Sequence, residues 1–247
     1  MVIADEVFLE GYISVEAAIR GGNRPLHHLY IRRGKWDRRV GRLVKQAEAQ
    51  QIPVEQVDEA FIAERVEGQT HGGIIAVVGV RQFVDLGALL GKRERPFIIM
   101  LDGIEDPFNY GQAIRALYAA GVDGLVVRPR NWLSAVGIVA RASAGTSELM
   151  PMAVAETADQ AAAFYKQHGL HIACTTAERA VSIYKADLTA PMFLLIGGER
   201  RGITRSFMEM ADSRLQIPYG RPFPHSLGAA TSAAIIGFEW MRQRGEI

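Results

Sequence analysis

Cysteine is almost absent from the sequence: its 247 residues include one, Cys174, which we expect to be a small buried residue. A lone cysteine cannot form an internal disulfide, and without cysteine pairs the chain has no zinc ribbon and no CxxC redox motif. The six histidines are scattered, with no carboxylate at ligand spacing, so we expect no metal site. These absences exclude a disulfide scaffold and favour a reducing, cytoplasmic environment.

Long hydrophobic runs are also missing. The beginning of the chain has no basic segment followed by an apolar core, so it does not read as a secretory signal. The longest apolar stretch, residues 227–238, is shorter than the roughly 18 to 20 residues that span a bilayer, and it is rich in small side chains. We therefore expect a cytoplasmic protein with no membrane partner, in which this stretch forms a closely packed helix.

The chain carries little net charge, +1, but its basic residues are unevenly distributed. Residues 20–45 contain nine arginines and lysines against the single acid Asp37. A basic face of this kind suits contact with RNA phosphates, and we assign that contact to Arg32, Arg33, Arg38 and Arg39. A helix face that is merely solvated remains the alternative.

Two patterns of hydrophobic residues divide the chain. Residues 1–80 alternate short elements: a helix from an N-cap at Ser14 to residues 21–22, strands at 28–31, 53–57 and 74–78, and helices at 36–50 and 58–65. Residues 81–96 read as a linker. From residue 97 to 247, strands alternate with longer helices, which predicts an α/β domain with a mostly parallel sheet covered by helices.

Polar and glycine-rich segments follow two of the strands in the second domain. After residues 97–101, Asp106-Pro107 makes a turn that precedes Asn109 and Arg115. After residues 192–196, the glycines 197 and 198 break the strand and precede Glu199 and a further glycine at 202. We expect Glu199 to pair with a buried arginine, for which Arg115 is the candidate. Neither segment is a GxGxxG fingerprint or a Walker A loop.

A third segment follows the last predicted strand. Ile217-Pro218 ends that strand, residues 220–224 form a loop, and Ser226 reads as the N-cap of the final helix, residues 226–242. A helix N-terminus favours an anionic or oxygen-rich group beside it. Because open α/β sheets bind ligands at the carboxyl ends of their strands, we expect all three segments to contribute to one site.

Taken in order, DPFNYGQAIR, LLIGGERRG and IP…G…SL resemble the three motifs of the SpoU/TrmH family of RNA ribose 2′-O-methyltransferases, within the SPOUT superfamily. VFLEGYISVEAAI and HGGIIAVV resemble the L30e-like substrate-binding domain of its rRNA-modifying members, and RASAGTSE is similar to the family's ASAGA segment. The resemblance implies a trefoil-knotted methyltransferase domain, a bent S-adenosylmethionine cofactor, a homodimer, and rRNA as substrate.

The resemblance also assigns roles to residues. It implies that main-chain groups of Gly197, Ile217 and Leu227 hold the cofactor and that Gly198 and Gly202 shape the same loop. The catalytic residues would be Asn109, Arg115, Glu199 and Ser226. Since a guanidinium is protonated at any ordinary pH, we assign Arg115 to holding an RNA phosphate and polarising the ribose hydroxyl, and leave the proton acceptor open.

The sequence departs from the family at one motif position. The third motif ordinarily reads SLN, whereas Gly228 stands here in place of the asparagine. Glycine offers no side-chain amide, so catalysis is affected rather than cofactor binding. The alternatives are a catalytically weakened, ribosome-associated protein that binds RNA and cofactor, and a methyltransferase that acts on tRNA.

Overall fold

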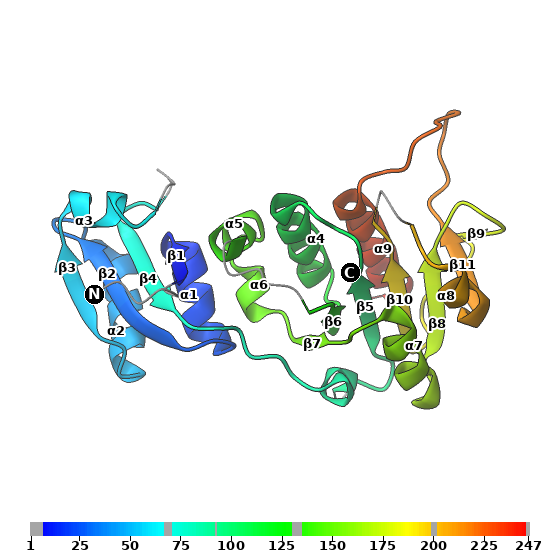
Figure 1. Cartoon of the computed structure of the whole chain (residues 1–247), viewed down its shortest axis with the longest axis horizontal. Helices are drawn as coiled ribbons and strands as arrows, with labels where there is room; N and C mark the ends of the chain where they lie inside the picture. Colours follow the sequence, from blue (N-terminus) through cyan, green and yellow to red (C-terminus); the bar gives the residue numbers. More distant parts are fainter. Residues whose placement is uncertain (1–6, 67–70, 92, 130–134, 199–201, 246–247) are drawn as a thin grey trace. The chain divides into compact units, whose positions relative to one another are not determined.

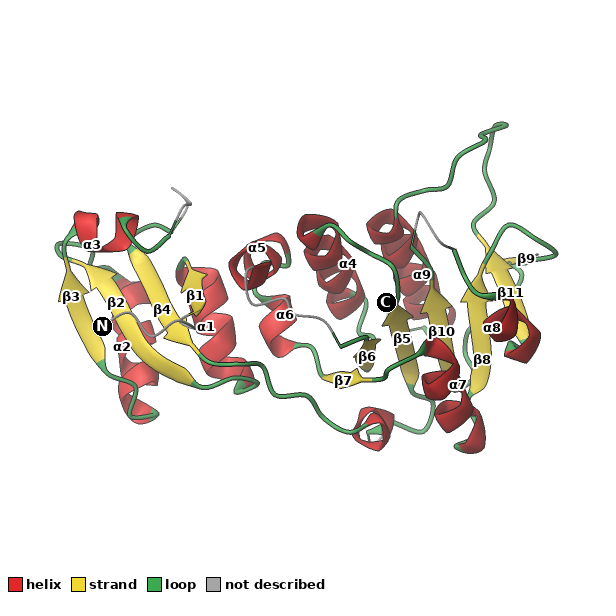
Figure 2. Cartoon of the chain, in the orientation of Figure 1, coloured by secondary structure: helices red, strands yellow, loops and turns green. Residues whose placement is uncertain are grey.

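In the computed structural model, the described residues are 7–66, 71–91, 93–129, 135–198 and 202–245 (Figure 1). The chain divides into two compact units. The first unit comprises Met1–Gln82 with Asn131–Leu149, and the second comprises Phe83–Arg130 with Met150–Ile247. Each unit is built around a sheet of its own, of four strands in the first and seven in the second (Figure 2).

The sheet of the first unit has the order β1-β4-β2-β3. The central strand β4 (Ile74–Val78) is antiparallel to β1 (Val7–Glu10) and β2 (Leu26–Arg32), and β2 is parallel to β3 (Val54–Val57). All five residues of β4 are buried, as their apolar, β-branched character predicted. The helices are α1 (Tyr12–Gly21), α2 (Arg38–Ala49) and α3 (Glu59–Ala63).

The start of α1 differs from the prediction. Its N-cap is Gly11, and Ser14 is buried within the helix rather than capping it. Gly11 has φ of 80° and its N–H bonds to the Ile74 carbonyl, so the chain turns directly out of β1 at a position that only glycine adopts easily. The predicted end is confirmed, because Gly22 is left-handed and donates to the Ala18 carbonyl.

Helices from later in the sequence complete the first unit. They are α5 (Val136–Ala142) and α6 (Thr146–Leu149). Val136 and Ala140 are buried in the same apolar cluster as Leu9, Leu29 and Leu43. The core of the first unit is therefore shared between residues from the beginning of the chain and residues of α5, far along the sequence.

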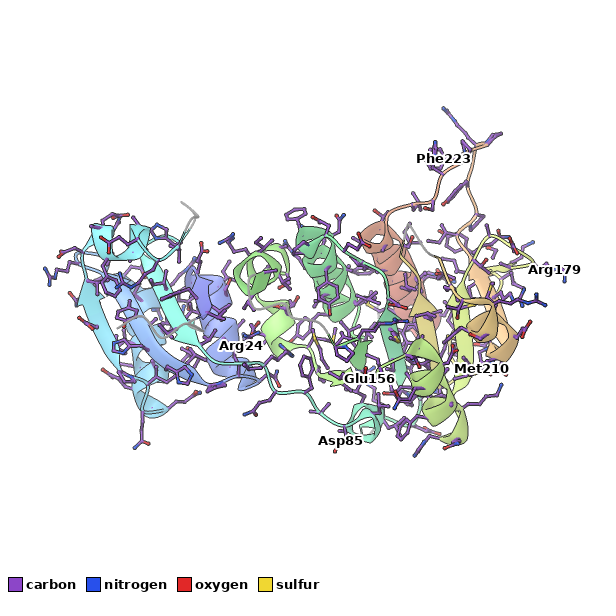
Figure 3. All side chains as sticks on the ribbon, viewed as in Figure 1. Arg24, Asp85, Glu156, Arg179, Met210 and Phe223 are labelled. Carbon is purple, nitrogen blue, oxygen red and sulfur yellow. The ribbon has the colours of Figure 1, made fainter. Side chains whose placement is uncertain are left out.

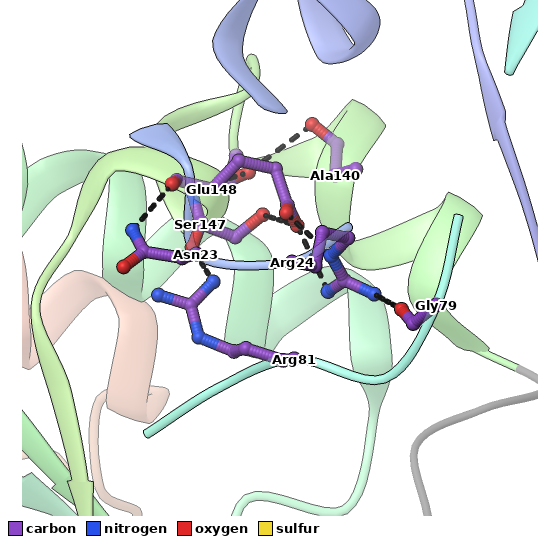
Figure 4. A network of polar contacts seen from close by, with 8 residues as sticks. Asn23, Arg24, Gly79, Arg81, Ala140, Ser147 and Glu148 are labelled. Carbon is purple, nitrogen blue, oxygen red and sulfur yellow. Dashed lines mark hydrogen bonds and ion pairs between the residues drawn. The ribbon is translucent and has the colours of Figure 1, made fainter. Parts of the chain in front are cut away.

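A buried ion pair accompanies this packing (Figure 4). Arg24 donates to both carboxylate oxygens of Glu148, at 2.6 Å and 3.2 Å, and the two side chains are 5% and 2% exposed. Arg24 also donates to the Gly79 carbonyl, and Ser147 donates to Glu148. The Asn23 side-chain amide donates to the Glu148 carbonyl at 2.8 Å. The buried charges are thus paired and hydrogen-bonded within the first unit.

The second unit contains a parallel sheet of the order β7-β6-β5-β10-β8-β11-β9. This confirms the predicted mostly parallel architecture. Its strands are β5 (Phe97–Leu101), β6 (Gly124–Val127), β7 (Met152–Val154), β8 (His171–Thr175), β9 (Val181–Ser182), β10 (Met192–Ile196) and β11 (Ser213–Gln216). Its helices are the 3-10 helix η1 (Leu86–Leu90), α4 (Pro107–Ala119), α7 (Ala158–Gln167), α8 (Arg205–Met210) and α9 (Ala229–Gln243).

Helices cover both faces of this sheet. Ile98 and Met100 on one face of β5 belong to a buried cluster with residues of η1, α7 and α8. Alternate residues of a strand point to opposite faces, and Phe97 stacks on Trp240 of α9 with ring centroids 4.8 Å apart. Cys174 in β8 is buried as expected, and burial raises the pKa of its thiol. Within the described ranges, no helix has the length and apolar character needed to cross a membrane.

Candidate active site

The site lies at the carboxyl ends of β5 and β10, which are neighbours in the sheet. Leu101 is in register with Ile196, and the Asp102 N–H donates to the Ile196 carbonyl. The loops that follow the two strands therefore start side by side. A Cβ atom at Gly198 would lie 2.1 Å from the Gly103 carbonyl oxygen, so the two loops touch backbone to backbone and no side chain fits between them.

A pocket of about 160 Å³ opens at this contact. It is lined by Gly103, Ile104, Glu105, Asp106, Asn109, Gly198 and Ala229. These residues come from the loop between β5 and α4, from the first turn of α4, from the loop after β10 and from the first turn of α9. Each of the three segments thus places a residue at the pocket, but Ile217, Ser226 and Leu227 of the third segment are not among the residues that line it.

Asn109 is held at the pocket by the start of α4. Asp106 is the N-cap, and its Oδ1 atom accepts the Asn109 N–H at 2.7 Å. Pro107 fits the first turn, where its missing N–H has no helical partner to lose. Asn109 is exposed, so its side-chain amide is available to a ligand in the pocket.

Arg115 lies further along α4 and does not line the pocket. It is exposed, so the expectation of a buried arginine is wrong for this chain. Six residues of helix rotate its side chain by roughly 240° about the axis from Asn109, away from the side of α4 that lines the pocket. Glu199, its expected partner, lies outside the described residues.

The loop after β10 folds back on itself at its glycines. A Cβ atom at Gly197 would be 2.8 Å from the Cγ1 atom of Ile203. Gly202 has φ of 59°, and its N–H donates to the Gly198 carbonyl at 3.3 Å. Glycines at 197, 198 and 202 are therefore needed for the shape of this loop, whatever it binds.

The third segment departs most from the prediction. The helix α9 begins at Ala229 with Gly228 as its N-cap, so the interpretation of Ser226 as N-cap is wrong. Ser226 is exposed and lies two residues earlier, because the chain stays extended at Gly228, with ψ of 148°. No side chain caps this helix by a hydrogen bond.

Tyr219 is a residue of this segment that sequence reasoning missed. Its hydroxyl accepts the Leu227 N–H at 3.0 Å and so ties the two ends of the loop together. Ile217, directly after β11, is partly buried. Nothing in the residue pattern indicated the Tyr219 contact, since it depends on how the loop closes.

The four arginines assigned to RNA fall into two pairs. Arg32 and Arg33, at the end of β2, form ion pairs with Glu59 and Asp58. Arg38 and Arg39 begin α2 and are exposed. Acidic partners thus partly neutralise the first pair, whereas the second pair faces solvent.

The described part of the chain contains no group of three or more His, Cys, Asp or Glu side chains that would hold a metal ion. The pocket combines the backbone contact at Gly103 and Gly198 with the acidic residues Glu105 and Asp106, the amide residue Asn109 and the apolar residues Ile104 and Ala229. This mixed lining suits an organic ligand.

Comparison with protein families matches residues 96–238 to the SpoU rRNA methylase family. Residues 8–83 match the RNA 2′-O ribose methyltransferase substrate-binding family. The 23S rRNA (guanosine-2′-O-)-methyltransferase RlmB of Shewanella oneidensis is 30% identical over 237 residues, which is 95% of this chain and 96% of that protein. The protein of the same name from Yersinia pestis is 30% identical, with 95% and 96% covered.

Solved structures are similar along the whole chain. The SpoU methyltransferase AviRb from Streptomyces viridochromogenes, in complex with AdoMet, has a TM-score of 0.80 at 22% identity, with 99% of this chain and 92% of that one covered. The AdoMet-bound rRNA methyltransferase from Sinorhizobium meliloti has a TM-score of 0.78 at 22% identity, with 96% and 87% covered. These likenesses show the fold. Together with the family matches, they mean that the chain belongs to the SpoU rRNA methylase family and is an RNA ribose 2′-O-methyltransferase.

Proposed function

We propose that the protein methylates the ribose 2′-oxygen of a guanosine in 23S rRNA. The observation that carries the proposal is the pocket where the loops after β5 and β10 meet the first turn of α9. Two relatives named 23S rRNA (guanosine-2′-O-)-methyltransferase RlmB match 95% of this chain, and their name supports a guanosine of 23S rRNA as the substrate. That name supports rRNA over the tRNA alternative.

S-adenosylmethionine is the methyl donor, and the residues present fit it. At the contact between Gly103 and Gly198 the pocket wall consists of main-chain groups, and residues that include Glu105, Asp106 and Asn109 complete the wall. When bound, the cofactor supplies an electrophilic methyl group on a sulfonium. We assign its binding to main-chain groups of Gly197, Ile217 and Leu227, with Gly198 and Gly202 shaping the loop. At Leu227 we assign the carbonyl, because the N–H donates to Tyr219.

The residues of this chain contribute by positioning. Holding a ribose hydroxyl in line with a reactive methyl group lowers the barrier by fixing orientation, and a pocket wall that includes backbone groups and Asn109 suits that task. The guanidinium of Arg115 binds an RNA phosphate. Ser226 and Glu199 complete the proposed catalytic set.

Other expectations are part of the same proposal. Residues 1–80 bind the RNA through the face of Arg32, Arg33, Arg38 and Arg39. Residues 81–96 link this part of the chain to residues 97–247, which carry the reaction, although residues 131–149 belong to the first compact unit. We also propose a cytoplasmic homodimer with a trefoil-knotted methyltransferase domain. The exposure of Arg115 supports the dimer, because an exposed arginine can reach a site other than the pocket beside its own helix.

The test is transfer of labelled methyl from S-adenosylmethionine to unmodified 23S rRNA and, separately, to tRNA. We expect label in 23S rRNA that survives removal of the bases, and loss of most of that label with Arg115→Ala. The matched control is Arg205→Ala, which removes an exposed arginine of the second unit and should leave transfer unchanged. Label in tRNA alone would overturn the proposed substrate.

The catalytically weakened protein is the second candidate, and Gly228 favours it. Gly228 stands at the N-cap of α9, next to the pocket residue Ala229, and has no side chain to contribute there. The variant Gly228→Asn separates the two candidates. If the native protein binds cofactor and RNA but transfers no methyl, and Gly228→Asn does transfer it, the weakened protein is the correct reading.

A further inference from the structure

The loop between β11 and α9, residues 217–228, exposes aromatic side chains to solvent. We call it the aromatic loop. Tyr219 is 43% exposed and Phe223 is 51% exposed. Phe223 lies near the outer end of the loop, away from the sheet (Figure 3). Solvent-exposed rings gathered on one loop are typical of a surface that binds a partner.

The rings contact one another within the loop. Tyr219 and Phe223 have centroids 5.8 Å apart, and Phe223 and His225 have centroids 5.5 Å apart, both in edge-to-face geometry. The Tyr219 hydroxyl accepts the Leu227 N–H, and prolines at 222 and 224 restrict the backbone on both sides of Phe223. The loop thus holds its rings in place before any partner arrives.

The formal charge in the sequence around these rings is positive. No acidic residue occurs between Asp212 and Glu239, whereas Arg221 and His225 stand beside the rings. Arg221 and His225 are both exposed. Aromatic faces beside a guanidinium such as that of Arg221 are what single-stranded RNA binds, by stacking of bases and pairing of phosphates. A second copy of this loop would instead bring like charges together.

The aromatic loop leads directly into the first turn of α9, where a residue lines the pocket. Its chain returns to the pocket at Ala229, so the rings stand on the same segment as the pocket wall. A ribose presented to the pocket needs its neighbouring nucleotides held and unstacked. We propose that Phe223, supported by Tyr219, stacks on a base next to the target nucleotide, and that Arg221 pairs with a phosphate there. This inference rests on the proposed function.

The experiment measures binding of the full chain to a short single-stranded RNA and to an abasic RNA of equal length, over a range of salt. Phe223→Ala should weaken binding to the RNA by roughly five-fold or more, without changing the salt dependence, because stacking releases no counterions. Phe223→Trp should retain binding.

Arg221→Gln should instead lower the slope of log K against log salt by about one. Phe83→Ala, from a phenylalanine that is 46% exposed, is the matched control.

The abasic RNA shows whether the ring contacts a base. Phe223→Ala and the unaltered protein should bind it equally, since it has no base to stack. Equal binding of both proteins to the intact RNA would overturn the inference while leaving the proposed function in place. A change of oligomeric state with Phe223→Ala would also overturn it, because the loop would then be a protein interface. If the unaltered protein bound neither RNA, the proposed function itself would fail.

Discussion

At the scale of single residues, the contact between Gly198 and Gly103 leaves no room for a side chain at Gly198. We expect Gly198→Ala to force the loops after β5 and β10 apart, because its Cβ atom would lie 2.1 Å from a carbonyl oxygen. Overpacking of this kind costs about 1–3 kcal/mol. Thermal unfolding should show that loss, and calorimetry should show weakened binding of S-adenosylmethionine.

The control for this variant is Gly87→Ala. A Cβ atom there would meet its nearest neighbour, Phe164 Cζ, at 3.7 Å, an ordinary van der Waals distance. Its stability and cofactor affinity should match those of the unaltered protein. Equal behaviour of the two variants would contradict the tight contact at Gly198.

The ion pair between Arg24 and Glu148 predicts a large effect on stability. Glu148→Ala leaves the Arg24 guanidinium buried without its counterion, which costs about 3–5 kcal/mol. The exposed pair Arg205–Glu209 provides the comparison, and Glu209→Ala should cost less than about 1 kcal/mol. Urea denaturation measures both values. If the two variants lost similar amounts of unfolding free energy, the burial of the Arg24–Glu148 pair would not determine its contribution to stability.

At the scale of elements, the end of α9 is tied down by side chains. Arg242 donates to both carboxylate oxygens of Glu239, each at 2.8 Å, and Gln243 donates to the same carboxylate. The Gln243 amide also reaches residues 183–188, donating to the Ile183 and Ala186 carbonyls and accepting the Leu188 N–H. These contacts anchor α9, and with it the pocket residue at its other end.

This anchor predicts a pH dependence. The hydrogen bond from Arg242 lowers the pKa of Glu239 below its ordinary value. A group with a depressed folded-state pKa stabilises the protein above its unfolded pKa, about 4.3, and loses that contribution as the pH falls through the folded value. Relative to Glu239→Gln, the unaltered protein should be more stable at neutral pH. The difference should shrink below about pH 4 in urea denaturation at several pH values. A difference that did not change with pH would contradict the lowered pKa.

How far the sequence predicts the elements depends on which signal marks them. Apolar runs such as residues 97–101 and 192–196 predict their strands correctly, because both faces of these strands are buried. The starts of α1 and α9 are predicted wrongly, because glycines occupy both N-caps while serines nearby carry the usual capping signal. The two-residue strand β9 is too short to leave a pattern.

The candidate site is predictable to a similar degree. The first two loops meet because β5 and β10 pair in parallel, which places the carboxyl ends of the two strands side by side. The exposure of Arg115 and the bond from Leu227 to Tyr219 do not follow from spacing. The first depends on which face of α4 packs against the protein, and the second depends on how the loop before α9 closes.

At the scale of the whole molecule, a net charge of +1 gives no general attraction to RNA, so the basic face must act locally. We expect Arg38→Gln together with Arg39→Gln to weaken RNA binding and to lower its salt slope by about one per arginine removed. Arg33→Gln should change the slope less, because Asp58 already pairs with Arg33 at 3.0 Å. Binding titrations at several salt concentrations measure these slopes. An unchanged slope in the double variant would assign this face to solvent.

The interleaving of the two units has a consequence for how the chain is made and how such proteins diversify. The core of the first unit includes Val136 and Ala140, so it stays incomplete during synthesis until residue 149 has left the ribosome, long after β5 and β6 have emerged. The same arrangement restricts recombination. A relative that acquired only residues 1–82 of this protein would receive Arg24 without Glu148, and a functional exchange of the substrate-binding region must carry residues 131–149 with it.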